Sequence, residues 1–254
     1  MLIKLPMLPK QVLLLVIALN SLHLFAQEKE KPFRRVMIGV NFSPDVAFRV
    51  LTQRNNDEIT TKIIESNRKT EIPKFGYCVG LNTLINIKSF VGVETGVWFM
   101  NMGYQTKWRQ VNFGFNWNGT TFEPTGLAQH RLIDDFHYIG IPLKVNFTVG
   151  KGKLRFFAAA GLAVNFLVST TNTLVIKGYE PENRKNTTPD NFDYNRLNIM
   201  PLAEAGIDYK INNRMNLKVS PSFRFGVINI TPSQTPIGAF LFNGGINVKY
   251  YFGI

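Results

Sequence analysis

The chain has 254 residues, a net charge of +12 and many aromatic side chains. This length corresponds to one domain once an N-terminal leader is removed, which argues against a multidomain protein. The one cysteine, Cys78, excludes an internal disulfide framework, and its place within a strand pattern indicates a buried thiol.

The N-terminal segment has the features of a secretory signal peptide. Basic residues precede an apolar run over residues 12–19, and the small residue Ala26 ends the apolar region. We therefore predict a signal peptide over residues 1–26 and a periplasmic tail over residues 27–34. A retained membrane anchor is the alternative, but the apolar run is much shorter than the ~20 residues that a spanning helix needs.

From residue 35 to residue 254, apolar residues alternate with small or polar residues in eight stretches. The first stretch, residues 36–50, alternates without a break in phase, which is a strong strand signal. Pro44 lacks an amide hydrogen, so we expect a bulge or local bend there. The outward apolar positions of the seven further predicted strands fall within residues 75–87, 91–99, 139–149, 156–168, 197–209, 215–227 and 240–252.

The connections between these strands alternate between long and short. The short ones are turns at residues 88–89, where only a tight turn fits the gap, at 150–153, which are rich in glycine, and at 212–213, where asparagine favours a tight turn. Alternating strands joined in this way are typical of outer-membrane barrels. We predict an all-β fold over residues 35–254: an eight-stranded antiparallel up-and-down transmembrane β-barrel with short periplasmic turns and long extracellular loops, in the cell outer membrane.

A soluble β-sandwich is the alternative architecture, because its strands also alternate. A sandwich would bury its apolar face and expose a charged one, whereas the second face of these strands is rich in Gly, Ala, Asn and Ser, as a narrow closed lumen requires. Aromatic residues lie near both ends of the apolar face, as the two interfaces of a bilayer favour. They are Phe75, Phe99, Phe166 and Phe240 toward the loops, and Phe147, Phe156, Tyr209, Tyr250 and Phe252 toward the turns.

Charged residues on the inward face form the first candidate site. They are Asp45, Arg49, Glu94, Lys144, Arg155, Glu204, Asp208, Lys218, Arg224 and Lys249. Eight strands enclose an interior that side chains can fill, so we predict a polar network that neutralises buried charge. A proton or ion path is the alternative. A turn centred on Asn213 places Asp208 opposite Lys218, which predicts a cross-strand ion pair.

The long connection over residues 103–136 contains a second, short alternation that ends at Asn118-Gly119, a hairpin signal. Its aromatic side chains are a candidate surface for a glycan or for a partner strand. The residues of this candidate surface are Trp108, Phe113, Phe115 and Trp117. Packing of the same side chains over the barrel mouth is the other interpretation, and we favour it over binding.

An enzymatic barrel would need a histidine with a nucleophile or base at its outer rim. The mature chain has two histidines, His130 and His137, with Asp134 and Asp135 nearby and no serine in a recognisable arrangement. We therefore predict no catalytic residue, no metal site and no cofactor. A lipid A-modifying enzyme remains the alternative.

The positive charge gathers at the predicted periplasmic rim, whereas acids and bases balance in the long loops. Nine bases face two acids at this rim, namely Lys29, Lys31, Arg34, Arg35, Lys88, Lys151, Lys153, Lys210 and Arg214 against Glu28 and Glu30. Anionic headgroups of outer-membrane lipids are the simplest partner, because each base near an anionic surface contributes about 1 kcal/mol. A periplasmic protein or peptidoglycan is the alternative partner, and the compartment excludes nucleic acid.

Four motifs carry a resemblance to a known family: GVNFSPD at residues 39–45, YIGIPLK at 138–144, FAAAG at 157–161 and KYYF at 249–252. Through them the mature chain resembles the PorT-like outer-membrane barrel family of Bacteroidetes. The resemblance implies insertion by the barrel-assembly machinery, with Phe252 as the final aromatic signal. It also implies a non-catalytic envelope or secretion-apparatus component of the type IX or gliding kind. A surface adhesin or ligand-binding barrel is a further alternative.

Overall fold

A computed structural model describes residues 34–112, 115–117, 122–124, 127–177, 180–186, 194–232 and 235–254. The predicted signal peptide, and all of the predicted periplasmic tail except Arg34, lie outside these ranges, so both stay predictions. Within the described ranges, no helix has the length and hydropathy needed to cross a bilayer.

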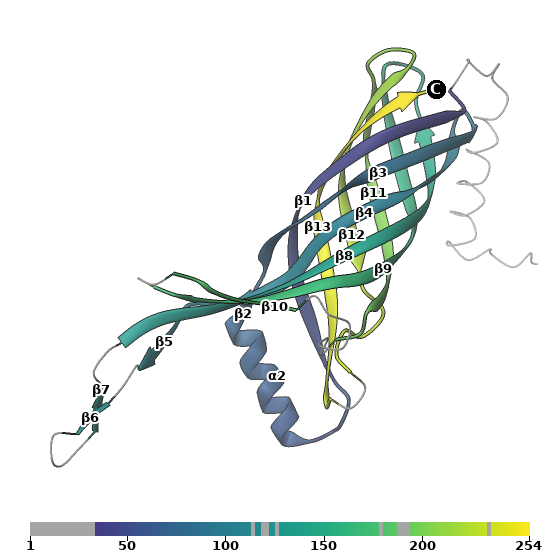
Figure 1. Ribbon diagram of the computed structural model, residues 1–254. Coiled ribbons are helices and arrows are strands. Elements are labelled where there is room, and N and C mark those ends of the chain that lie inside the picture. Colours follow the sequence, from purple (N-terminus) through teal and green to yellow (C-terminus); the bar gives the residue numbers. More distant parts are fainter. Residues whose placement is uncertain are drawn as a thin grey trace, which may run out of the picture. The chain divides into compact units, whose positions relative to one another are not determined.

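Eight long antiparallel strands in the described residues close into a barrel (Figure 1). They are β1 (Val36–Gln53), β3 (Lys74–Lys88), β4 (Val91–Thr106), β8 (Leu127–Val149), β9 (Leu154–Ile176), β11 (Leu197–Lys210), β12 (Met215–Phe225) and β13 (Ile237–Gly253). Each of these strands pairs with the next one along the chain, and β1 pairs with β13 to close the ring. The predicted eight-stranded up-and-down barrel is confirmed.

The two faces of the strands follow the predicted alternation. In β1, the outward side chains of Val40, Phe42 and Val46 are exposed, whereas Asn41 and Ser43, on the other face of the strand, are buried in the lumen. The same pattern continues through the other seven strands. An apolar outward surface of this kind is what contact with lipid requires.

Pro44 does not produce the bulge that the sequence predicted. The pairing of β1 with β13 has the same register before and after Pro44, and only the pairs opposite Ser43 and Pro44 are missing. The missing amide hydrogen therefore interrupts the ladder locally without inserting an extra residue.

Three short turns lie at one end of the barrel, which we call the turn end. They join β3 to β4, β8 to β9 and β11 to β12, and β13 ends beside them (Figure 1). In the last turn, Asn212 Oδ1 accepts hydrogen bonds from the backbone amides of Arg214 and Met215, at 2.7 and 2.9 Å. An asparagine side chain that mimics a backbone turn in this way fixes the connection.

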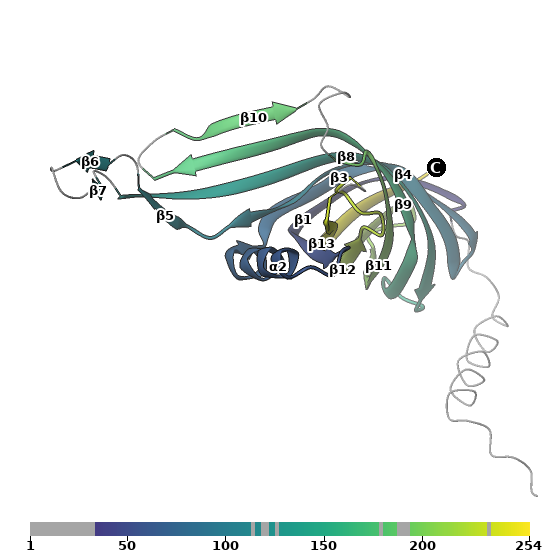
Figure 2. The same ribbon diagram turned by 90° about the horizontal axis from the view of Figure 1, so that it is seen from below.

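The opposite end, which we call the loop end, carries structure that the sequence analysis predicted only in part. Both β8 and β9 continue beyond the barrel, flanked by β5 (Arg109–Asn112) and β10 (Glu182–Asn186), and form a projecting sheet (Figure 2). The predicted hairpin around Asn118-Gly119 is confirmed, because β6 (Phe115–Trp117) pairs with β7 (Phe122–Pro124). Beyond the membrane both faces of a sheet meet water, so the alternation that marked the barrel strands is lost.

A short helix, α2 (Glu58–Thr70), and the short strand β2 (Glu71–Ile72) also lie at the loop end. Asp57 caps the helix by accepting hydrogen bonds from the hydroxyl and the backbone amide of Thr60, and these bonds lower the pKa of Asp57. Ile64 packs into the apolar core of the lumen, and Arg68 donates to the carbonyl of Leu51 in β1. The helix therefore covers part of the barrel mouth.

Gly103 provides a test of the packing between β4 and β8. Its φ is +145°, and a Cβ atom there would lie 1.9 Å from the carbonyl oxygen of Asp134. Because both the conformation and the space exclude a side chain, we expect Gly103→Ala to lower the free energy of unfolding by about 1–3 kcal/mol. Urea titration of the folded barrel, followed by tryptophan fluorescence, measures this change.

The matched control is Gly152→Ala in the turn between β8 and β9. A Cβ atom at Gly152 would meet no heavy atom closer than 3.9 Å, so its cost should stay within ~0.5 kcal/mol. Equal losses in the two variants would contradict the close approach at Gly103.

Candidate functional site

Two glutamates and two lysines meet inside the lumen, and we call them the lumen ring: Glu94 of β4, Lys144 of β8, Glu204 of β11 and Lys249 of β13. Each is at most 5% exposed. Lys249 Nζ lies 2.9 and 3.1 Å from the two carboxylate oxygens of Glu94, and Lys144 Nζ lies 3.0 Å from Glu204 Oε1. The pairs Lys144–Glu94 and Lys249–Glu204 close the ring.

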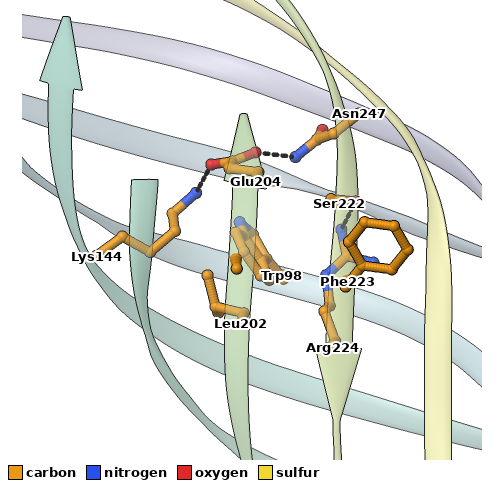
Figure 3. Close-up of a pocket in the computed structure, with 9 residues that line it drawn as sticks. Trp98, Lys144, Leu202, Glu204, Ser222, Phe223, Arg224 and Asn247 are labelled. Carbon is orange, nitrogen blue, oxygen red and sulfur yellow. Dashed lines mark hydrogen bonds and ion pairs between the residues drawn. The ribbon is translucent and has the colours of Figure 1, made fainter. Parts of the chain in front are cut away.

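Neutral side chains complete the hydrogen bonding of the two carboxylates. Asn146 donates to Glu94 Oε2 at 3.0 Å. Ser220 and Asn247 donate to Glu204 Oε2 at 3.2 and 3.3 Å; Figure 3 shows the bond from Asn247. Buried charges are tolerated when they are paired and their remaining lone pairs have donors. The lumen ring meets both conditions.

A second ion pair lies on the loop side of the ring. Arg224 Nη1 donates to Asp45 Oδ2 at 2.9 Å, and Ser43 Oγ donates to the other oxygen of Asp45 at 2.5 Å. The ring of Trp98 lies between the two cationic groups, 4.8 Å from Lys144 Nζ and 5.4 Å from Arg224 Cζ (Figure 3). Both cations therefore gain a favourable contact with the indole face.

On the turn side of the ring, the register prediction is confirmed and the pairing prediction is wrong. Asp208 lies directly opposite Lys218, but Asp208 pairs with Arg155 at 2.7 Å and accepts from Asn216 at 3.1 Å. Lys218 Nζ donates instead to Asn146 at 3.4 Å, and no ion pair forms between it and a carboxylate of the described residues. Asp208 also lies directly opposite Arg155 of β9, its other neighbouring strand. The ion pair forms with Arg155 and not with Lys218.

Arg49 belongs to a separate cluster at the loop end. It donates from Nε to Glu71 of β2 at 2.8 Å, and its guanidinium lies 3.7 Å from the ring centroid of Tyr104. Nearby, Lys74 pairs with Asp135 at 2.6 Å. The sequence analysis missed Glu71 and Lys74 because it assigned no partner to residues of the first long loop.

The loop half of the lumen is filled by apolar side chains, which the sequence analysis did not predict. Residues of all the barrel strands except β12 form this core together with Ile64 of α2 and Ile230. Its largest members include Met100, Met102, Phe136, Tyr138 and Met200. The space that Trp98, Lys144 and Arg224 line below the core holds no water-sized void. Polar and apolar side chains together therefore fill this part of the lumen.

The candidate loop surface is described only in part. Trp108 is 43% exposed, and the guanidinium of Arg131 lies 4.9 Å from its ring centroid. Phe113 and the side chains of Phe115 and Trp117 lie outside the described residues. The surface stays a prediction.

The histidines at the outer rim have structural contacts. Asn101 Nδ2 lies 3.0 Å from His137 Nε2 and donates to Asp135 Oδ1 at 2.8 Å, and the ring of His137 stacks on Phe99 at 5.8 Å. His130 of β8 lies directly opposite Arg109 of β5 in the strand register. Asn101 therefore contacts both His137 and Asp135.

Breaking the lumen ring should strongly destabilise the barrel. Replacing Lys249 by Met leaves two buried carboxylates to share one lysine, so we expect the free energy of unfolding to fall by about 3–5 kcal/mol. Lys62→Met is the matched control, because it removes the same group from the pair Glu58–Lys62, whose side chains are largely exposed. That change should cost less than ~1 kcal/mol in the same urea titration. A small loss in Lys249→Met would contradict the importance of the ring.

Comparison with known proteins places this barrel in a family. The family model of the outer membrane protein beta-barrel domain matches residues 25–231, while no curated protein matches. Among solved structures, neisserial surface protein A is 8% identical, with 88% of this chain and 100% of that chain covered and a TM-score of 0.45. OprG from Pseudomonas aeruginosa is 11% identical, with 89% and 100% covered and a TM-score of 0.44. The chain belongs to the outer membrane protein beta-barrel domain family, and its location is the outer membrane.

Proposed function

We propose that this chain is a non-catalytic component of the cell envelope or of a secretion apparatus of the type IX or gliding kind, and that it acts through its surfaces. The observation that carries the proposal is the lumen ring. A barrel that conducts needs a continuous aqueous path, whereas Glu94, Lys144, Glu204 and Lys249 join strands across the lumen. The resemblance of the chain to PorT-like barrels supports the secretion part of the proposal.

Passage of an ion would require the ring to open. Separating one lysine from its carboxylates exposes an uncompensated buried charge, at a cost of about 3–5 kcal/mol. The apolar core of the loop half would then have to open as well, because Met100, Met102 and Phe136 lie within it. These costs favour a filled barrel over a channel.

The contacts of the rim histidines favour a non-catalytic protein. A catalytic histidine needs a base or nucleophile within hydrogen-bond reach and a substrate beside it. His137 contacts the amide of Asn101 and stacks on Phe99, and Asp135 is engaged by Lys74 and Asn101. These contacts give His137 and Asp135 a structural role.

A second candidate function, surface binding, is favoured by the projecting sheet. The strands β5 and β10 lie at the two edges of this sheet, beside β8 and β9. Exposed strand edges offer backbone donors and acceptors to a partner strand. An adhesin or ligand-binding barrel would use this edge together with Trp108.

We expect the purified protein to give no stepwise conductance in planar bilayers, because the lumen is filled by charged pairs and apolar side chains. A porin reconstituted in the same lipid shows that channels would be detected. Long-lived conductance steps from the folded protein would contradict a filled lumen.

Deletion of the gene tests the proposed role in the cell. We expect exported proteins to accumulate in the periplasm while lipid A masses stay unchanged, as measured by proteomics of the secreted and periplasmic fractions and by mass spectrometry of lipid A. Complementation by the variant His130→Ala, His137→Ala should restore secretion.

Two other outcomes would contradict the proposal. A lipid A mass shift by one acyl chain, restored by the wild-type gene and not by the histidine variant, indicates a lipid-modifying enzyme. Intact secretion together with loss of surface attachment indicates the second candidate function.

A further inference from the structure

The polar part of the lumen, from the pair Arg224–Asp45 to the turn end, holds one base more than it holds acids among the described residues. Its five bases and four acids are Lys144, Arg155, Lys218, Arg224 and Lys249 against Asp45, Glu94, Glu204 and Asp208. Each carboxylate has a basic partner other than Lys218. The excess positive charge is therefore that of Lys218.

Lys218 is deeply buried and has few hydrogen bonds. The residue is 1% exposed, and its Nζ donates to Asn146 Oδ1 at 3.4 Å. The rings of Phe157 and Tyr251 have their centroids 4.6 and 5.8 Å from the same nitrogen. Aromatic faces attract a cation but are weak hydrogen-bond acceptors, and an ammonium has three hydrogens to donate. Two hydrogens of Lys218 therefore have no strong acceptor among the described residues.

Two further donors belong to the same region of the lumen. Arg155 Nε and Tyr251 Oη are buried and make no hydrogen bond to a described residue. Arg155 of β9 and Lys218 of β12 lie directly opposite the same residue, Asp208, on its two neighbouring strands. Both carboxylate oxygens of Asp208 already accept hydrogen bonds, from Arg155 and from Asn216. These side chains therefore offer donors to a ligand that accepts hydrogen bonds.

A small ion would reach this region from the turn end. Arg155 is the second residue of β9, and its side chain is 21% exposed, so one edge of the region meets solvent. Lys218 is the fourth residue of β12, which also begins at the turn end. Toward the loop end, the lumen ring and the apolar core around Met100 close the lumen. The region is therefore a dead end and not part of a channel.

We propose that Lys218, Arg155 and Tyr251 bind one small monovalent anion such as chloride. One negative charge removes the excess positive charge of the polar lumen, and buried charge is tolerated when it is compensated. A water molecule would accept hydrogen bonds from the same donors but would leave the charge. A divalent anion would replace the excess positive charge by an excess negative charge beside Asp208.

The first test measures the urea midpoint of the folded full-length protein in sodium chloride and in sodium gluconate at equal ionic strength. An anion that binds only the folded protein raises the folding equilibrium constant about tenfold at ten times its dissociation constant. We expect the wild type to have the higher midpoint in chloride, with a dependence on chloride concentration that saturates. Lys218→Met should lose this dependence, because it removes the excess charge.

Two control variants separate the site from general effects of charge. Lys62→Met removes the same group from an exposed position of α2, and it should keep the chloride response of the wild type. Glu28→Gln, Glu30→Gln removes two acids that precede the barrel in the sequence, and it should keep the response as well. A response that is seen only in this second variant would mean that one of these acids neutralises Lys218, and it would overturn the proposal.

Diffraction from wild-type crystals grown in sodium bromide gives a measurement that needs no variant, should Lys218→Met not fold. We expect an anomalous peak within hydrogen-bond reach of Lys218 Nζ. The absence of this peak would exclude the site. A peak without a chloride response in the wild type would indicate binding at crystal concentration only, and it would also overturn the proposal. An equal chloride response in the wild type and in Lys218→Met would mean that the salt acts on the barrel in general.

Discussion

Neutralisation of charge inside a narrow lumen is the constraint on which the rest of this structure depends. The lumen ring takes one residue each from β4, β8, β11 and β13, so it links strands that are not all neighbours in the wall. Glu94 and Lys144 also face each other directly across β4 and β8. A slip of one residue in that pairing would turn a charge toward lipid. The ring therefore sets the register of the wall as well as filling its interior.

The larger apolar cluster of the lumen lies on the loop side, whereas a smaller one, formed by Met37, Leu84 and Tyr251, lies among the polar groups of the turn side. On the turn side, charged and amide side chains satisfy one another, as in the contacts of Asp208 with Arg155 and Asn216. On the loop side, methionines and aromatic residues pack beneath Ile64 of α2. An apolar cluster can close the mouth with few polar partners, because most of its side chains, such as Met100 and Met200, carry no hydrogen-bond donor. The polar part of the lumen, in contrast, needs the ion pairs of the lumen ring to neutralise its buried charges.

The sequence predicts the wall of this barrel better than its interior or its loops. Alternation reports which face a residue lies on, and this was enough for all eight barrel strands and for the register of Asp208 with Lys218. Alternation does not show which of two cross-strand neighbours forms an ion pair with a given carboxylate. The partner of Asp208 is Arg155, which lies 53 residues away in the chain. The helix α2 had a readable signal, since Asp57 precedes an amphipathic pattern with Ile64 on its buried face.

The ends of the barrel differ in how their charges are used. At the loop end, Arg49 and Lys74 are paired with acids of this chain, so their positive charges are neutralised within the protein. At the turn end, Lys153, Lys210 and Arg214 lie on exposed or half-buried positions beside exposed apolar residues. The four side chains of the lumen ring are buried instead, so loss of one of them leaves an opposite charge without its partner in the interior. Substitutions in the ring should therefore change stability more than substitutions at Lys153, Lys210 and Arg214.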